Sequence, residues 1–181
     1  MSSAILQGGT SGTGSMTVLA PNTNSNQVAT LPDATGTVMV SGNMPAFSAY
    51  STALVSSPAS TFTKITYDTE DFDTNSNFAS SRFTPTVAGY YQFNATISYS
   101  ANSAVGGGLV TFYKNGTRFL DGPFSILSAT TTQFISGSGI IYLNGSTDYV
   151  EVYGYQTTVS AMNIGSASST NKFTGCLVRT A

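Results

Sequence analysis

The stretch RFTPTVAGYYQFNATISYS, from Arg82 to Ser100, decides the fold class. From Tyr91 onward, apolar and polar residues alternate, which is the period of a β-strand with one buried face. The polar set of residues 92, 94, 96 and 98 should face solvent or a neighbouring subunit. The opposite set should pack inside a sandwich or at a subunit interface, and it comprises Tyr91, Phe93, Ala95, Ile97 and Tyr99.

The rest of the chain repeats this plan in short runs of Val, Ile, Thr, Tyr and Phe that Gly, Asn, Ser and Pro interrupt. No helical period occurs, so the pattern predicts an all-β sandwich or barrel. GLVTFYKNGTRFL predicts a hairpin around Asn115-Gly116, and GIIYLNGSTDYVEVYGY predicts another around Asn144-Gly145. TNKFTGCLV is expected to form the last strand, with Phe173, Gly175 and Leu177 on one face.

Charge is scarce along the chain. Its 181 residues include six Lys or Arg and eight Asp or Glu, and the net charge is −2. This content lies far below the roughly 25% that is typical of soluble domains, so we expect no binding of nucleic acid. No apolar run reaches the length of a membrane span, and no membrane insertion is expected. A surface with so little charge favours association.

Residues 1–44 form a separate segment. SMTVLAPNTNSNQVATLPDATGTVMVSG predicts three short strands, too few to form a core alone, so a partner should hold them. The start, MSSAILQGGTSGTGS, lacks the basic and apolar regions of a signal peptide, and we expect no export by that route. The lone Cys176 excludes an internal disulfide.

The chain offers few groups for catalysis. Without histidine, it cannot form a His-dependent triad or a His metal site. Cys176 is expected to be a small buried apolar residue, and residues 106–108, three glycines, a flexible loop. We therefore predict no catalytic residue and no cofactor.

Four acids lie close together in YDTEDFDTNSN, namely Asp68, Glu70, Asp71 and Asp73. Such a cluster could bind Ca²⁺, but Ser76 and Arg82 replace the glycine and glutamate of a calcium loop. We favour a solvated loop and assign no metal site. Tyrosines are also abundant, and exposed ones could contact carbohydrate or protein, although packing within an assembly is the more common role.

Phe83, Gly89, Tyr91 and Phe93 form the pattern F-x5-G-x-Y-x-F, which resembles the signature of the complement C-one-q globular head, a tumour-necrosis-factor-like jelly roll. AFSAY, VTFYKNG, YLNGSTDYVEV and FTGCLV resemble further segments of that family, in the same order, over residues 45–181. The resemblance implies a ten-stranded antiparallel jelly-roll sandwich that assembles into a trimer. It also implies that Gly89 has a positive φ or a close backbone contact. The residues expected in the core or trimer interface are Phe83, Gly89, Tyr91, Phe93, Phe112, Val150, Phe173 and Leu177.

The N-terminal segment resembles the attachment segments of fibre and decoration proteins of tailed bacteriophages, through its APNT and LPDATGT stretches. This implies a β-meander or extended arm that fastens the chain to a particle. The residues expected to anchor it are Val18, Leu19, Val28, Leu31, Val38 and Val40.

Together these observations predict a non-enzymatic virion protein, made in the host cytoplasm and located on the outside of the particle. Residues 1–44 would bind other virion proteins, and residues 45–181 would form a homotrimeric knob that contacts a host glycan or protein. One alternative is a secreted, non-viral trimeric binding module. Another is an enzyme on a jelly-roll scaffold, which the missing histidine disfavours.

Overall fold

The computed structural model describes residues 3–7, 12–19, 23–26, 28, 39–40, 42, 44–100, 105–165 and 168–181. All of its regular elements are β-strands apart from a single 3-10 residue, and the strands pair antiparallel, which confirms the predicted fold class. The chain divides into two units, Met1–Gly36 and Thr37–Ala181.

The first unit contains an antiparallel pair of strands, β1 (Ser3–Gln7) and β2 (Ser15–Leu19). β2 coincides with the first of the three predicted strands, whereas β1 was not predicted. The other two predicted strands fall largely on residues 29–38, outside the described residues. A two-stranded hairpin is at best marginally stable in water, so this unit depends on further contacts.

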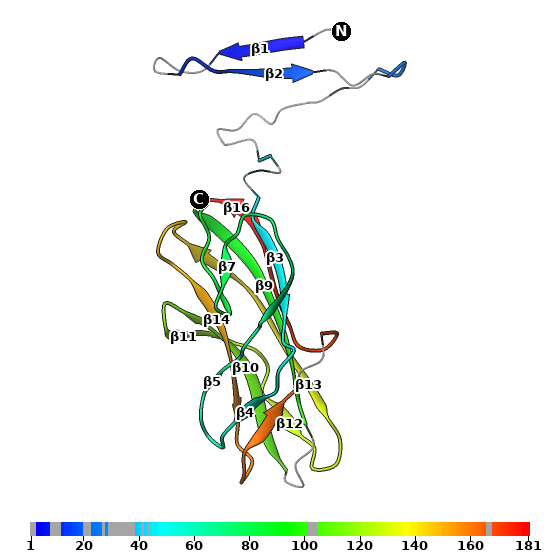
Figure 1. Cartoon of the computed structure of the whole chain (residues 1–181), viewed down its shortest axis with the longest axis vertical. Helices are drawn as coiled ribbons and strands as arrows, with labels where there is room; N and C mark the ends of the chain where they lie inside the picture. Colours follow the sequence, from blue (N-terminus) through cyan, green and yellow to red (C-terminus); the bar gives the residue numbers. More distant parts are fainter. Residues whose placement is uncertain are drawn as a thin grey trace. The chain divides into compact units, whose positions relative to one another are not determined.

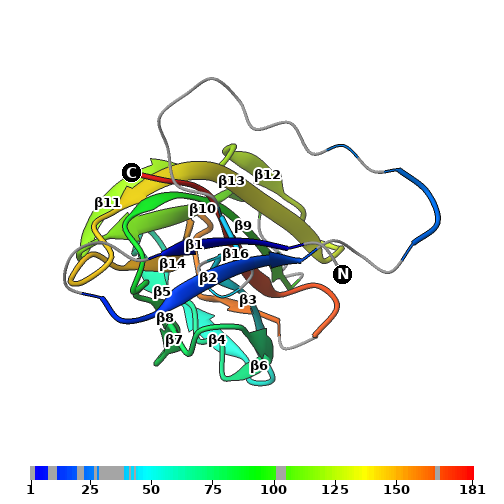
Figure 2. The ribbon, with the colours of Figure 1, turned by 90° about the horizontal axis from the view of Figure 1, so that it is seen from above.

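The second unit is a sandwich of two sheets, seen along its length in Figure 1 and from above in Figure 2. We name the sheets after their central strands. The β9 sheet consists of β3 (Ala46–Tyr50), β4 (Val55–Ser57), β6 (Thr69–Asp73), β9 (Gly89–Tyr99), β13 (Gln133–Leu143), β15 (Met162–Ile164) and β16 (Lys172–Thr180). β9 lies between β13 and β16, and β3 and β6 continue the sheet beyond β16.

The β10 sheet forms the opposite layer. It consists of β5 (Thr63–Lys64), β7 (Phe78–Ala79), β8 (Arg82–Phe83), β10 (Gly106–Lys114), β11 (Thr117–Asp121), β12 (Ser125–Leu127) and β14 (Val150–Gln156). β10 and β14 pair over seven residues at its centre. The two sheets thus contain fourteen described strands, several of only two or three residues, where ten were expected.

The core lies between the sheets and is rich in phenylalanine. Phe47 of β3 stacks on Phe83 of β8 with ring centroids 4.5 Å apart, and it meets Phe173 of β16 edge-on at 4.9 Å. Phe93 of β9 contacts Phe112 of β10 across the sandwich. Side chains of both sheets therefore interdigitate, and the inward half of the alternation predicted for β9 is confirmed, because the five side chains expected inside are at most 1% exposed. Of the four polar residues expected to face outward, Ser98 is instead buried, and its N–H donates to Oδ1 of Asn171.

Two predicted connections have different outcomes. Asn115 and Gly116 both have positive φ, at 53° and 77°, and join β10 to β11 as predicted. The hairpin predicted at Asn144-Gly145 is wrong, since β13 belongs to the β9 sheet and β14 to the β10 sheet. The Asn144 side chain instead caps a longer turn, and its Oδ1 accepts the N–H groups of residues 146, 147 and 148 at 2.9–3.0 Å.

The run of glycines at 106–108 is not a loop, as the sequence suggested, but the start of β10. The reason is close packing. A Cβ atom on Gly107 would lie 2.1 Å from the ring of Phe124, and one on Gly106 would lie 2.8 Å from Thr158. Glycine lets these neighbours lie directly on the strand.

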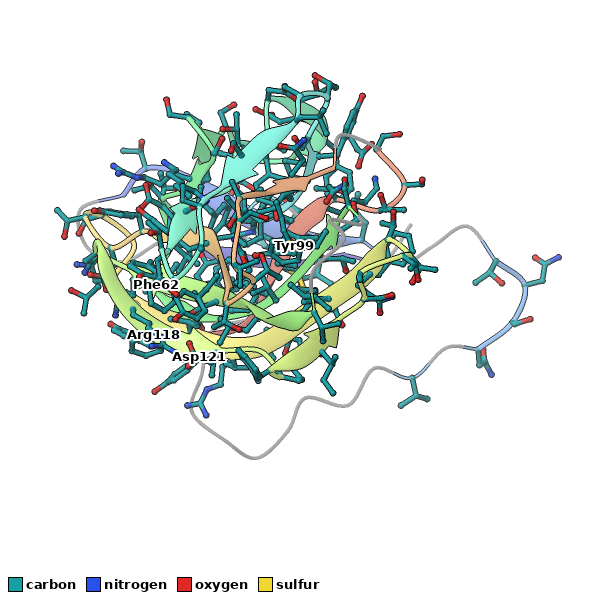
Figure 3. All side chains as sticks on the ribbon, turned by 90° about the horizontal axis from the view of Figure 1, so that it is seen from below. Phe62, Tyr99, Arg118 and Asp121 are labelled. Carbon is teal, nitrogen blue, oxygen red and sulfur yellow. The ribbon has the colours of Figure 1, made fainter. Side chains whose placement is uncertain are left out.

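Two buried tyrosines of β9 differ in how their hydroxyl groups are satisfied. Tyr91 donates a hydrogen bond of 2.7 Å to the carbonyl of Val87. Tyr99 lies in the interior (Figure 3), where its hydroxyl reaches Gly154 of the other sheet and has no hydrogen-bond partner among the described residues. The Ser57 hydroxyl is close to it but is likewise unpaired. Burial raises the pKa of Tyr99, so this group stays a neutral phenol.

This difference predicts that the two tyrosines respond differently in stability when each is replaced by phenylalanine. Tyr91→Phe should lower the free energy of unfolding by about 1 kcal/mol, because it removes a satisfied hydrogen bond. Tyr99→Phe should leave stability unchanged or raise it, since it removes a buried hydroxyl that lacks a partner. Denaturant midpoints of the two variants check this. An equal loss of stability in both would show that the Tyr99 hydroxyl is satisfied.

Candidate functional site

The outward side of the β9 sheet is the most distinctive surface of the molecule. Alternation along β9, β13 and β16 places the non-core residues there. Apolar side chains are exposed at one end of it, where Tyr90 and Tyr142 pair across strands with ring centroids 5.4 Å apart. We call this surface the β9-sheet face and define it by Tyr90, Gln92, Asn94, Thr96, Phe134, Ser136, Ser138, Ile140, Tyr142, Thr174, Cys176 and Val178.

None of these twelve side chains carries a charge at neutral pH. Phe134 is 61% exposed, Ile140 56% and Val178 50%, although each sits on a regular strand. Apolar side chains arranged in this way on a sheet, with hydroxyl and amide groups between them, are typical of surfaces that other proteins cover.

A second apolar surface lies along the neighbouring edge. Phe119 of β11, together with Phe124 and Ile126 at β12, exposes more than half of its side chain. We call these three residues the apolar edge. They belong to the β10 sheet, so this surface is distinct from the β9-sheet face.

Hollows lie on the β9-sheet face. One of about 580 Å³ lies between Asn94, Thr96, Ser136 and Ser138 on the face and residues 121–123 after β11. A smaller one of about 180 Å³ is lined by Phe72, Thr174 and Cys176, among others. Their polar groups are hydroxyls, amides and a carboxylate already paired with Arg118, which is no arrangement for acid–base chemistry.

Cys176 is exposed in one of these hollows, so the expectation that it is buried is wrong. The cause is the period of β16. Phe173, Gly175 and Leu177 occupy the core side, as predicted, and the residue between the last two must then point outward.

The acidic stretch does not converge on a point. Asp68 accepts hydrogen bonds from the N–H and hydroxyl of Thr52, while Asp71 pairs with Lys172 and accepts from the hydroxyl of Ser48. Asp73 accepts from the N–H of Phe78 at 2.7 Å. Among the described residues no three acidic or cysteine side chains lie close enough to hold one metal ion. Asp68 and Asp73 instead fix the two ends of β6, and Asp71 ties its middle to β3 and β16.

The residues predicted for the core or trimer interface all lie in the interior of the single sandwich. Seven are side chains of which at most 4% is exposed: Phe83, Tyr91, Phe93, Phe112, Val150, Phe173 and Leu177. Gly89 is buried too, and of its two expected features it has the close contact, since a Cβ atom there would lie 2.4 Å from the carbonyl oxygen of Arg179. Its φ is not positive.

The predicted anchoring residues are exposed where the structure describes them. Val18 is 53% exposed, Leu19 64%, Val28 90% and Val40 58%, whereas Leu31 and Val38 lie outside the described residues. No helix in the described part is long and apolar enough to cross a membrane.

Charge is concentrated on the other side of the sandwich. Four of the six basic residues pair with acids of the β10 sheet or its connections: Lys64 and Arg82 with Glu151, Lys114 with Asp148, and Arg118 with Asp121. Between these pairs lie four partly exposed rings, those of Phe62, Tyr113, Tyr153 and Tyr155. The abundance of tyrosine is visible in the sequence, but the clustering of these three tyrosines is not, because they come from strands distant along the chain.

Glu151 is the central acid of this surface and only 3% exposed. Its Oε1 accepts from Lys64 Nζ at 2.8 Å and from Arg82 Nε at 2.9 Å, and the Arg82 guanidinium lies 3.7 Å from the ring of Tyr149. Burial alone would raise the pKa of Glu151, but the hydrogen bonds from Lys64 and Arg82 outweigh it and hold the pKa below its usual value.

A carboxyl whose pKa is lowered by folding stabilises the fold above its unfolded pKa, and this contribution is lost as the pH falls through the folded value. Glu151→Gln should therefore lower the free energy of unfolding by about 1–3 kcal/mol at pH 7, less than for a fully buried pair because both cations are partly exposed. The difference from wild type should shrink below about pH 4. Asp121→Asn, which breaks an exposed pair, should cost less than about 1 kcal/mol.

Denaturation at pH 7, 5 and 3 measures these values. A constant effect of Glu151→Gln over this range would mean that the ion pairs do not cause the loss.

Comparison with known proteins bears on the fold. No family model and no curated protein matches the chain. Among solved structures, murine APRIL matches with a TM-score of 0.55 and 11% identity, over 75% of this chain and 99% of APRIL. The Eiger TNF of S. frugiperda matches with a TM-score of 0.52 and 10% identity, over 76% and 93%. The two-sheet architecture is therefore that of the tumour-necrosis-factor-like jelly roll, as the motifs had suggested.

Proposed function

We propose that this chain is a structural protein of a tailed-bacteriophage virion, a short homotrimeric fibre or decoration protein with no enzymatic activity. The observation that carries the assembly is the pair of apolar surfaces on one chain. The β9-sheet face and the apolar edge differ, so contact between the edge of one copy and the face of the next is head-to-tail, and rotation closes such contacts into a ring. The jelly-roll likeness supports a ring of three.

The distribution of charge supports the same orientation of subunits. Burying the twelve side chains of the β9-sheet face removes no charge from water, although Lys172 and Arg179 of β16 border this face, in register with Thr96 and Tyr90. Burying the β10 sheet would desolvate four ion pairs. The uncharged face would thus lie inside the trimer and the charged sheet outside. Cys176 would be covered in the assembly, together with the hollow that it lines.

The first unit supplies the proposed anchor. Its two strands cannot form a stable fold alone, and the described anchoring residues are apolar and exposed. Strand pairing with sister chains or with another virion protein would stabilise the two strands and cover the exposed apolar residues. With the anchor on the particle, the knob lies on the virion's outer surface, where three copies act together on the host.

The alternative is a secreted, non-viral trimeric binding module built on the same fold. Such a module would have the same knob and the same trimer as the proposed virion protein. The two functions differ in what the first unit does, because only a virion protein needs it to join a particle.

The trimer is tested by light scattering, where the purified chain should give three times the 18.8 kDa of one copy. Ile140→Asp should convert it into monomers, because it would bury an unpaired charge at the interface. Leu54→Asp is the matched control: it changes an exposed aliphatic residue outside the β9-sheet face, and should leave the trimer intact. A monomeric wild-type chain at micromolar concentration would contradict the proposal.

The anchor is tested by deleting residues 1–36, a cut that keeps Met39, which packs against the core. The shortened chain should remain folded and trimeric, yet fail to appear in purified particles when it replaces the full chain in an infected host. Normal incorporation would show that residues 37–181 suffice for binding to the particle. The absence of the full-length chain from particles would favour the non-viral alternative.

A further inference from the structure

We propose that the outward side of the β10 sheet binds a neutral glycan through its cluster of aromatic rings and ion pairs. We define this aromatic band by Phe62, Tyr113, Arg118, Asp121, Tyr153 and Tyr155. The inference goes beyond trimer formation and particle attachment, and names the chemistry that the knob would recognise. It rests on the proposed function only for the source of the glycan.

The rings of the band are held in place by one another. Tyr113 stacks on Tyr153 with centroids 3.9 Å apart, and Phe62 stacks on Tyr155 at 4.5 Å. Phe62 also lies 6.1 Å from Tyr113, which joins the two stacks. Each ring remains partly exposed, so a ligand would meet aromatic surface that needs little ordering on binding. Aromatic surface with phenol groups suits the mixed apolar and hydroxyl surface of a sugar ring.

Fixed polar groups border these rings. Arg118 donates from Nε to Oδ1 of Asp121 at 2.8 Å and makes a second bond from its terminal nitrogen to Oδ2. The Arg118 guanidinium lies 4.6 Å from the ring of Phe62, and Figure 3 shows Phe62, Arg118 and Asp121 on the same side of the sandwich. Both charged side chains are more than 40% exposed, so they retain donors and lone pairs for hydroxyl groups.

The charges favour a neutral ligand. At one end Arg118 is paired with Asp121, and at the other Lys64 and Arg82 share Glu151. Because every cation here already has an acidic partner, a polyanion finds little free positive charge. Hydroxyl groups, in contrast, can both donate to the carboxylates and accept from the guanidinium groups.

The composition of the band suits a glycan. None of the most exposed large apolar side chains belongs to the band, and the band contains no aliphatic residue. Its apolar surface is that of aromatic rings alone, bordered by fixed polar groups, which matches the face of a sugar ring. A trimer would present three such bands, and multivalency would strengthen weak individual contacts.

The test uses the full-length chain on an array of immobilised oligosaccharides that includes neutral, sialylated and sulfated members. The wild type should bind a subset of the neutral ones. Phe62→Ala and Arg118→Gln should each weaken that binding about tenfold or more, since each removes a central contact. Lys172→Gln is the matched control, because Lys172 and Asp71 form an ion pair of similar exposure away from the band. It should bind like the wild type.

Thermal unfolding and light scattering of each variant establish that fold and trimer persist. If Phe62→Ala fails to fold, Arg118→Gln alone decides, because its side chain is 45% exposed and lies outside the core. Absence of binding to every neutral glycan, binding only to charged ones, or retention of binding in Arg118→Gln would overturn the proposal. So would binding to a host surface that persists after its glycans are destroyed by periodate, which would indicate a protein partner. Loss of particle incorporation on deleting residues 1–36 is independent of all these outcomes.

Discussion

The alternation of side chains along β9 is the constraint on which the rest of the structure depends. This strand has eleven residues, a neighbour on each side, and one face in the phenylalanine core. Because side chains alternate along a strand, the other set of β9 side chains must point away from the core. The register of pairing extends the same division between inward and outward residues to β13 and β16. A one-residue slip would exchange Tyr91 and Phe93 for polar neighbours, so the core fixes the register. The uncharged outward surface is then a consequence of the same pairing.

The scarcity of charge shapes this molecule as much as its core does. With so few ionic groups, the β10 sheet and its connections hold four of the five ion pairs among the described residues. The β9 sheet carries one, Lys172 with Asp71, beside hydroxyls, amides and apolar side chains. The two sides of the sandwich therefore differ in what they can bind. One suits burial against identical copies, and the other suits contact with water and polar ligands. This division supports the proposed trimer and the proposed glycan site on different sheets. Asp121 lies at their border, because it belongs to the aromatic band and also lines a hollow on the β9-sheet face.

The sequence predicted the features that depend on local rules. The strand period of β9 and the turn at Asn115-Gly116 follow from residue type alone, and both are confirmed. The turn at Asn144-Gly145 has the same dipeptide but joins strands of different sheets, which no local signal reveals. The glycines of 106–108 were misread because their partners, Phe124 and Thr158, are distant in sequence. Cys176 was misassigned although its own strand period placed it outside. The aromatic band could not be predicted, since it joins three strands and a loop through tertiary packing.

The position of β3 has a mechanical consequence. The connection from the first unit enters the sandwich at this strand, which pairs with β16 on one side and β6 on the other. Tension applied along β3 by a tethered particle would load the hydrogen bonds of both ladders together, in shear, rather than opening them one at a time. Forced unfolding depends on the height of the barrier to unfolding, and a strand held on both edges raises it. A sandwich loaded through this strand would resist tension at its point of attachment while its opposite end remains free to engage a surface.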